Sequence, residues 1–190
     1  MEEIKFFETI KCDDFEVFNL EYHNKRVANT IGLNIDLQEY IYPISGELLR
    51  CKVIYDENEI LDVQYFPYKK REIKSFKIIN CDEIDYSKKY LNRESLDNLF
   101  EKKEDCDEVI IVKNGIITDT SIANIAIFYE AQWLTSKECL LKGTTRARLL
   151  EEKKIIEKDI TLDMLKNASQ IALMNAMIGF YIIKDYSFKI

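Results

Sequence analysis

Several residues from position 88 onward are of types suited to catalysis or to ligand binding. They are the neighbouring Lys88 and Lys89, Asp119 at the end of "NGIITD", Gly143, Thr144 and Thr145 in "LLKGTTRARLL", and Asn175 in "LMNAM". A lysine amine can attack an aldehyde carbon as a nucleophile. A carboxylate placed opposite a ring nitrogen favours the protonated form of that nitrogen. Backbone N–H groups at the start of a helix bind phosphate, and two threonine hydroxyls add further donors.

Each of these residues also has an ordinary structural explanation. Adjacent lysines often belong to a solvated face, and Gly-Thr-Thr before a helix is often only an N-cap. Asp119 could simply finish a turn, and Asn175, a polar residue within an apolar strand, could satisfy a backbone group. Together, however, the set supplies an amine, a carboxylate and a phosphate cradle. Those are the groups that a protein needs in order to bind pyridoxal phosphate.

The composition narrows the class of protein. Hydrophobic residues make up 47% of the 190 residues, which is enough for a substantial core, and only 5 Gly and 2 Pro argue against disorder. The net charge of −7 and the scattered lysines and arginines disfavour a nucleic-acid partner. No apolar run is long enough to span a bilayer and no leader opens the chain, so we expect a cytoplasmic protein without a membrane partner.

The cysteines point in the same direction. They are odd in number, widely spaced and form no CxxC pair: Cys12, Cys51, Cys81, Cys106 and Cys139. This pattern predicts reduced thiols and no metal site.

The first half of the chain predicts a small α+β unit. "IKFFETIKC" and "FEVFNL" flank the polar pair Asp13–Asp14, which indicates a β-hairpin. Residues 21–33 are expected to form a helix whose apolar side carries Tyr22, Val27, Ile31 and Leu33. Period-two alternation predicts strands in the segments 47–56, 60–68 and 73–80.

The second half follows a polar break at "CDEIDYS". Helices are expected at 92–103, 144–155 and 161–168, and strands at 108–112, within 124–135 and across most of 170–185. Asn114–Gly115 indicates a tight turn into another strand. The pattern is α+β, with two subdomains of mixed sheets and helices: a smaller N-terminal one over 1–84 and a larger C-terminal, cofactor-binding one over 85–190.

The ordered motifs resemble the class IV aminotransferase family, the fold type IV pyridoxal phosphate enzymes. The order is a lysine, then "G-x-x-x-D/E-x-x-x-x-N", then "L-x-G-x-T-R", then "N-A" in an apolar strand. "FFETIK" is similar to the family's F-E-T opening, and "HNKR" to its H-x-x-R. "KYLNR" and "LMNAM" are similar to the K-H-L-N-R and N-A-L motifs of 4-amino-4-deoxychorismate lyases. The family usually has glutamate at the position of Asp119 and a further N-terminal strand, so we expect a shortened N-terminus here.

The resemblance implies a role for each matching residue. The family lysine directly precedes the aromatic residue of "YLNR", which makes it Lys89. Because neighbouring side chains of an extended segment point to opposite faces, Lys88 would lie on the other face. Lys89 would form the Schiff base and move protons, and Asp119 would pair with the pyridine nitrogen. Leu141 would pack against the ring, and the phosphate would be held by Arg26, Gly143, Thr144, Thr145 and Asn175. The cofactor would then lie between the two subdomains, where such pockets are common.

Three remaining residues receive structural interpretations. Asn124 matches the family asparagine that follows the carboxylate, and we interpret it as more structural than catalytic. His23 lies inside "HNKR", where we interpret it as a local structural group rather than a catalyst. Cys139 is close to the expected phosphate loop and is interpreted as part of the core.

The resemblance also implies a function, with alternatives left open. Motif similarity favours a lyase that converts 4-amino-4-deoxychorismate to 4-aminobenzoate and pyruvate in folate biosynthesis, acting on a small-molecule amino substrate as a homodimer. The same groups would serve a class IV aminotransferase for D-amino or branched-chain amino acids. A third possibility is a reduced homologue that binds the cofactor without turnover.

Overall fold

The computed structural model describes residues 4–190, which form an α+β protein, as the sequence predicts. The chain divides into two compact units. The first contains the residues up to Lys70 together with Lys88–Asn92, and the second contains Arg71–Ser87 and Arg93–Ile190. The predicted boundary at residues 84 and 85 falls inside the segment Arg71–Ser87, and Lys89 belongs to the first unit.

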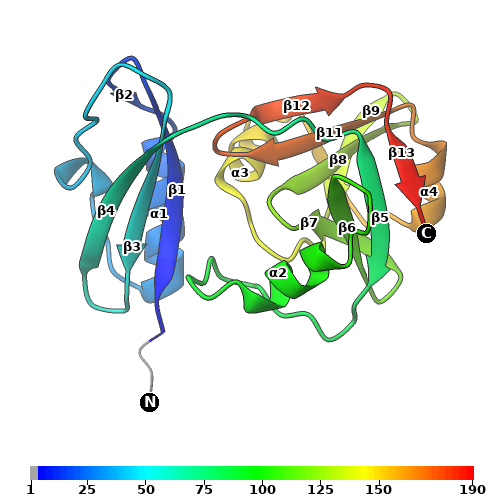
Figure 1. Ribbon diagram of the computed structural model, residues 1–190, viewed down its shortest axis with the longest axis horizontal. Helices are drawn as coiled ribbons and strands as arrows, with labels where there is room; N and C mark the ends of the chain where they lie inside the picture. The colour runs from blue at the N-terminus through cyan, green and yellow to red at the C-terminus, as the bar shows by residue number, and fades with distance from the viewer. Residues whose placement is uncertain (1–3) are drawn as a thin grey trace. The chain divides into compact units, whose positions relative to one another are not determined.

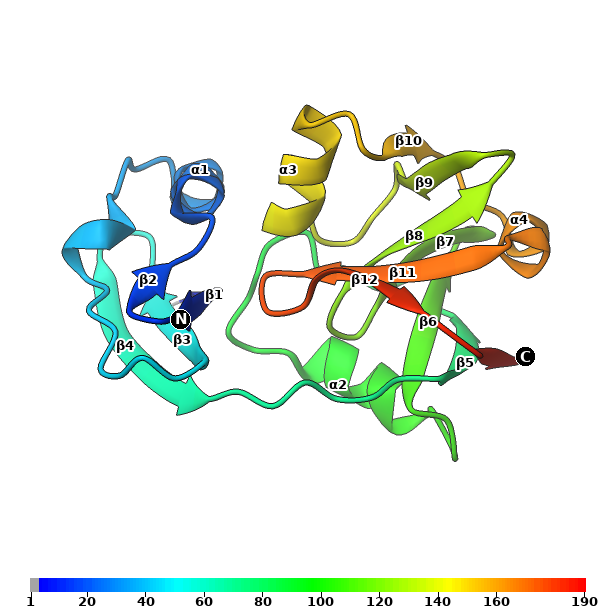
Figure 2. The same ribbon diagram turned by 90° about the horizontal axis from the view of Figure 1, so that it is seen from above.

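The first unit is built on a four-stranded sheet with the order β2-β1-β3-β4 and antiparallel neighbours. Its elements are β1 (Phe6–Asp13), β2 (Glu16–Val17), α1 (Leu20–Ile31), the 3-10 turn η1 (Leu37–Glu39), β3 (Leu49–Tyr55) and β4 (Ile60–Pro67). The predicted hairpin is confirmed, because β1 pairs with β2 across a turn in which Asp14 and Phe15 both have positive φ. Helix α1 lies against one face of this sheet (Figures 1 and 2).

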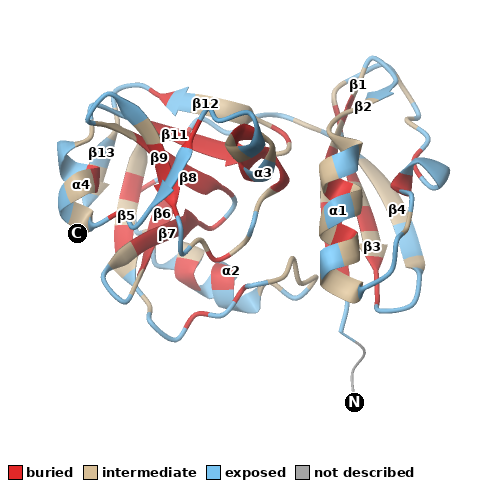
Figure 3. Ribbon diagram, turned by 180° about the vertical axis from the view of Figure 1, so that it is seen from behind, coloured by how far each residue is buried: buried red, intermediate tan, exposed pale blue. Residues whose placement is uncertain are grey.

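The predicted helix in this unit is confirmed except at its end. Gly32 adopts a φ of 79° and its N–H bonds to Ala28 O, which terminates α1 in the left-handed conformation that glycine tolerates best. Leu33 therefore lies beyond the helix and is 43% exposed, so its prediction as part of the apolar side was wrong. Buried residues follow β1, β3 and the inner side of α1, where Val27 is fully buried (Figure 3).

The segment Lys88–Asn92 is attached to the start of β1 by backbone contacts. Phe7 N donates to Lys89 O at 3.0 Å, Leu91 N donates to Lys5 O at 2.8 Å, and Phe6 and Tyr90 form a bridge. These bonds place the backbone of Lys89 directly beside β1.

The second unit is built on a nine-stranded sheet. Seven of the strands follow the order β10-β9-β8-β7-β6-β5-β13, and the other two are β11, which pairs with β8, and β12, which pairs with β11. Its strands are β5 (Ser75–Asn80), β6 (Glu108–Lys113), β7 (Ile116–Thr120), β8 (Asn124–Tyr129), β9 (Gln132–Ser136), β10 (Ile156–Lys158), β11 (Gln170–Asn175), β12 (Gly179–Ile183) and β13 (Ser187–Lys189). Its helices are α2 (Glu94–Glu101), α3 (Thr144–Glu151) and α4 (Leu162–Asn167).

Local sequence signals in this unit are mostly confirmed. Asn114 and Gly115 have positive φ of 51° and 77°, as a tight turn between β6 and β7 requires. Helix α3 begins at Thr144 but ends at Glu151, earlier than expected, because the chain turns to bring Ile155 into a small core cluster with residues of β8, β11 and α3. Strand β13 was not predicted; it pairs in parallel with β5. Within residues 4–190, no helix is long and apolar enough to cross a membrane.

Candidate functional site

The two neighbouring lysines of the first unit have different surroundings. Lys88 Nζ donates a hydrogen bond of 2.8 Å to Thr30 O in α1 and lies 5.5 Å from the ring centroid of Phe6. Lys89 Nζ lies 4.5 Å from the ring centroid of Phe7. Phe6 and Phe7 are successive residues of β1, and successive strand residues point to opposite faces. The two ammonium groups therefore contact rings on opposite faces of β1, as the extended-segment argument predicts.

Arg26, expected to contact a phosphate, is held by a carboxylate of the same unit. Its Nε donates to Glu8 Oε1 at 2.8 Å, and its Nη2 donates to Glu8 Oε2. Glu8 is fully buried, and His23 Nδ1 also contacts Oε2, at 2.5 Å. Burial alone would raise the pKa of Glu8, but the charge of Arg26 and the hydrogen bond from His23 lower this pKa to about 2. Glu8 is therefore ionised at neutral pH.

His23 completes this buried cluster as a neutral ring. Its pKa is lowered because burial disfavours the charged form, which outweighs the hydrogen bond to Glu8. An ionised carboxylate only accepts hydrogen bonds, so Nδ1 carries the proton and Nε2 carries the lone pair. Nε2 is buried and has no hydrogen-bond partner among residues 4–190. The structural interpretation of His23 from the sequence agrees with these contacts.

In the second unit, Asp119 lies near the end of β7 as a buried carboxylate. The residue is only 4% exposed. Its Oδ1 accepts a hydrogen bond of 2.7 Å from Asn124 Nδ2, and its Oδ2 accepts one of 2.9 Å from Leu141 N. Burial raises the pKa of Asp119 to about 6, and these two hydrogen bonds oppose that rise. An acid with this pKa is largely ionised at neutral pH and can stabilise a nearby proton.

Asn124 connects Asp119 to the loop that precedes α3. Its Nδ2 also donates to Leu141 O at 2.7 Å. A Cβ atom added to Gly143 would lie only 2.1 Å from Asn124 Oδ1. Because φ of Gly143 is −68°, glycine is needed here for space rather than for conformation. The structural role predicted for Asn124 thus has a specific form, which is the positioning of Asp119 and Leu141.

The start of α3 has the geometry of a phosphate cradle. The first i→i−4 bond of the helix runs from Ala147 N to Gly143 O, so the N–H groups of Thr144, Thr145 and Arg146 come before it. Gly143 occupies the N-cap position and has no side chain that could accept from them. Thr144 and Thr145 are buried. Exposed N–H groups and the helix dipole favour an anion at such a terminus, so these residues fit a phosphate group.

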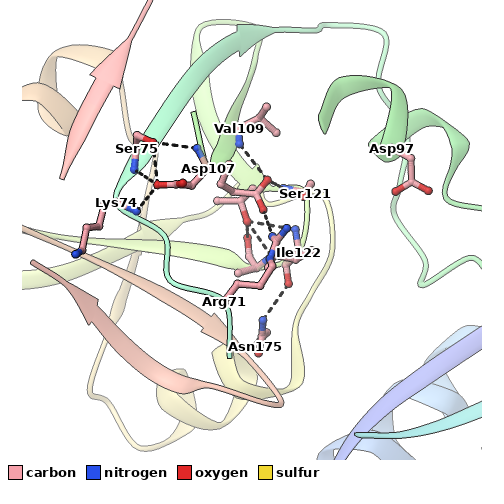
Figure 4. A network of polar contacts seen from close by, with 12 residues as sticks. Arg71, Lys74, Ser75, Asp97, Asp107, Val109, Ser121, Ile122 and Asn175 are labelled. Atoms are coloured by element: carbon pink, nitrogen blue, oxygen red, sulfur yellow. Dashed lines mark hydrogen bonds and ion pairs between the residues drawn. The ribbon is translucent and has the colours of Figure 1, made fainter. Parts of the chain in front are cut away.

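The loop between Asp119 and Asn124 is clamped by three side chains (Figure 4). Ser121 N donates to Glu108 Oε1 at 3.3 Å, and Arg93 Nη2 donates to Ser121 O at 2.9 Å. Asn175 Nδ2 donates to Ile122 O at 3.3 Å. Glu108 is fully buried, and its Oε2 accepts a hydrogen bond of 2.6 Å from Arg71 Nη2. This clamp holds the backbone on which Asp119 and Asn124 depend.

The side chain of Asn175 has two backbone tasks. Besides donating to Ile122 O, its Oδ1 accepts 3.0 Å bonds from Met177 N and Ile178 N in the turn after β11. These contacts match the structural explanation that the sequence left open. The expected contribution of Asn175 to phosphate binding stays a prediction.

Each unit thus gathers its own share of the predicted residues. The first contains Lys89 and Arg26, and both of their charges lower the pKa of His23. The second contains Asp119, Leu141, Gly143, Thr144, Thr145 and Asn175. Sequence analysis missed Glu8, although a signal existed. In β1, residues 6, 8 and 10 share a face, so a carboxylate lies among apolar core positions there.

Comparisons with known proteins identify a family and a fold. A family model described as amino-transferase class IV matches residues 86–186. A crystal structure from Haemophilus somnus, provisionally described as a 4-amino-4-deoxychorismate lyase, is 36% identical, covers 94% of this chain and 99% of its own, and gives a TM-score of 0.86. A Schizosaccharomyces pombe protein, provisionally named an aminodeoxychorismate lyase, is 28% identical over 93% of this chain and 87% of its own.

A more distant structure shows the same fold. A hypothetical aminotransferase from Mycobacterium tuberculosis in its PLP-bound form is 16% identical, covers 94% of this chain and 80% of its own, and gives a TM-score of 0.80. The predicted fold type IV architecture is confirmed by these structural matches.

Proposed function

Because the chain belongs to the class IV aminotransferase family, we propose that it is a pyridoxal phosphate enzyme that converts 4-amino-4-deoxychorismate to 4-aminobenzoate and pyruvate for folate biosynthesis. The observation that carries a cofactor-dependent activity is the buried Asp119, held by Asn124 and by Leu141 N in the same unit as the glycine-capped start of α3. Similarity over nearly the whole chain to a structure provisionally described as a 4-amino-4-deoxychorismate lyase, together with "KYLNR", supports the specific reaction.

The bound cofactor would supply an aldehyde that can link to amines and a pyridine ring that withdraws electrons. Lys89 would provide the amine that holds the cofactor, and its Nζ would accept the proton from C4 of the substrate. Loss of that proton and of the enolpyruvyl group, which takes up a proton to become pyruvate, would leave the six-membered ring of the substrate aromatic.

The other residues bind and orient. Asp119, ionised at neutral pH, would keep the ring nitrogen of the cofactor protonated, which would make the ring a better electron acceptor. In the second unit, the N–H groups of Thr144 and Thr145 would suit a phosphate. In the first unit, the guanidinium of Arg26 would offer charge-assisted donors to an anion. Leu141 contributes an apolar contact to the ring, and its own N–H fixes Asp119.

The test is a direct assay of products. Purified protein loaded with pyridoxal phosphate is incubated with 4-amino-4-deoxychorismate, and separately with D-alanine or leucine plus 2-oxoglutarate. We expect 4-aminobenzoate and pyruvate in equal amounts from the first mixture and little glutamate from the second. Glutamate as the main product would instead support an aminotransferase. Bound cofactor without either product would support a homologue that lacks turnover.

A further inference from the structure

We infer that Glu8 is a positioning residue that orients the guanidinium group of Arg26 toward an anion. The inference rests on the proposed function in one respect, because the anion would be the phosphate of the cofactor. The contacts themselves belong entirely to the first unit, where Glu8 lies on β1 and Arg26 on α1.

The geometry of the pair fixes a direction. Glu8 accepts from Nε and Nη2 of Arg26 with its two oxygens, so a planar carboxylate faces one edge of a planar guanidinium. This fork-to-fork pairing determines the plane of the guanidinium and the direction in which its opposite edge, at Nη1, points. An anion bound to Arg26 would have to approach from that side.

A third residue holds the carboxylate itself in place. His23 Nδ1 contacts Glu8 Oε2 at 2.5 Å, and both side chains are fully buried. His23 and Arg26 are three residues apart on α1, so they lie on the same side of the helix and reach the same carboxylate from one turn. Glu8 therefore cannot change rotamer without losing contacts to two helix residues.

The charges show why orientation matters more than attraction. Glu8 is ionised and His23 is neutral, so the negative charge of Glu8 offsets the positive charge of Arg26. Lys89 is the further positive group that acts on His23. If Arg26 acted on a phosphate only through net charge, a buried carboxylate beside it would weaken binding. A carboxylate in this position is useful when the direction of the N–H groups decides the contact.

The experiment separates phosphate binding from all other effects. Equilibrium dissociation constants are measured for pyridoxal phosphate and for pyridoxal, which lacks the phosphate group, with wild-type, Glu8→Asp and Glu8→Gln proteins. The ratio of the two constants reports the phosphate contact alone, and general damage to the fold cancels. Glu8→Asp keeps the charge but retracts the carboxylate by one methylene group, whereas Glu8→Gln keeps the length and removes the charge.

The ratio of interest is the dissociation constant for pyridoxal divided by that for pyridoxal phosphate. We expect this ratio to fall by roughly tenfold in Glu8→Asp, as the loss of a directed charge-assisted hydrogen bond would cause. An unchanged ratio in Glu8→Asp overturns the inference, and a raised ratio in Glu8→Gln would then show that Glu8 acts only through its charge. Glu21→Asp, an exposed substitution on α1, the helix that carries Arg26, is the matched control and should keep the wild-type ratio.

Two further measurements cover failure of the main variant. If Glu8→Asp does not fold, Arg26→Lys retains a positive charge without the planar fork and should lower the ratio similarly; a wild-type ratio there overturns the inference. If the wild-type protein binds neither aldehyde, the proposed function fails. Inorganic phosphate is then titrated against the NMR signals of His23, the single histidine of the chain, and the absence of any shift overturns the inference.

Discussion

Asn124 Nδ2 donates a hydrogen bond of 2.7 Å to Asp119 Oδ1, and the missing side chain of Gly143 leaves the space in which Asn124 does so. Asp119 and Asn124 are opposite each other where β7 meets β8. The carboxylate is therefore positioned by strand pairing, by an amide and by a glycine that lies well beyond both in the sequence.

Gly143→Ala should disrupt this arrangement. The new methyl group would lie 2.1 Å from Asn124 Oδ1, so Asn124 must move and its bond to Asp119 is lost. Overpacking and a broken buried hydrogen bond together predict a loss of about 1–3 kcal/mol in the free energy of unfolding, together with weaker cofactor binding. Denaturant titration and spectroscopic titration with pyridoxal phosphate measure both. In Gly115→Ala, which is strained only by its φ of 77°, cofactor affinity should stay unchanged.

Asp119→Asn should retain bound cofactor and lose most of the catalytic rate. The amide of the introduced asparagine carries no charge, so it cannot stabilise a protonated ring nitrogen as a carboxylate does. It can still accept one of the two hydrogen bonds that Asp119 accepts. Steady-state kinetics with saturating cofactor measures the effect. Asp119→Glu, the family residue, should recover part of the rate if reach is the main difference. A wild-type rate in Asp119→Asn would contradict the assigned role.

Asp119 should also affect stability between about pH 4 and pH 6. Its pKa rises from 3.8 in the unfolded chain to about 6 in the folded protein, so the folded protein binds more protons in this window. The free energy of unfolding should therefore fall by about 3 kcal/mol as the pH rises through it. Denaturant titrations at half-unit pH steps would show this slope in the wild type and its absence in Asp119→Asn.

Glu8 should produce the opposite dependence at lower pH. Its pKa falls from 4.5 to about 2 on folding, so its stabilising contribution is complete above pH 4.5 and is lost as the pH falls toward 2. The free energy of unfolding should fall by about 3 kcal/mol over this range. Glu8→Gln should be less stable at neutral pH, with a shallower decline in acid. Equal slopes for both proteins would mean that other carboxylates dominate acid unfolding.

Lys89 and Lys88 should differ sharply in chemistry. Borohydride reduction of the loaded protein followed by peptide mapping should label Lys89, and Lys89→Ala should abolish turnover. Lys88 Nζ is bonded to Thr30 O, so Lys88→Ala should cost about 1 kcal/mol of stability and leave turnover close to wild type. A label on Lys88 would reverse the assignment.

The sequence by itself determined most of the helices and strands, and the family. Alternating apolar residues predicted β3, β4 and β5, and Asn114–Gly115 predicted the turn between β6 and β7, because these signals depend on near neighbours in the chain. The order of motifs from "FFETIK" to "LMNAM" indicated class IV aminotransferases before any contact was known. These features need only local backbone preferences and the linear order of residues.

Only the tertiary structure decided which side chains meet. The buried contacts of Glu8 with His23 and Arg26 join residues that are 15 and 18 positions apart, and Asn124 reaches Leu141 across 17 positions. The parallel pairing of β13 with β5 joins segments more than a hundred residues apart. Such contacts depend on how helices and strands pack. Burial raises the pKa of Asp119, whereas the charge of Arg26 and the hydrogen bond from His23 lower the pKa of Glu8 despite its burial. No local pattern contains that information, because the same carboxylate is an exposed charge or a buried one according to what covers it.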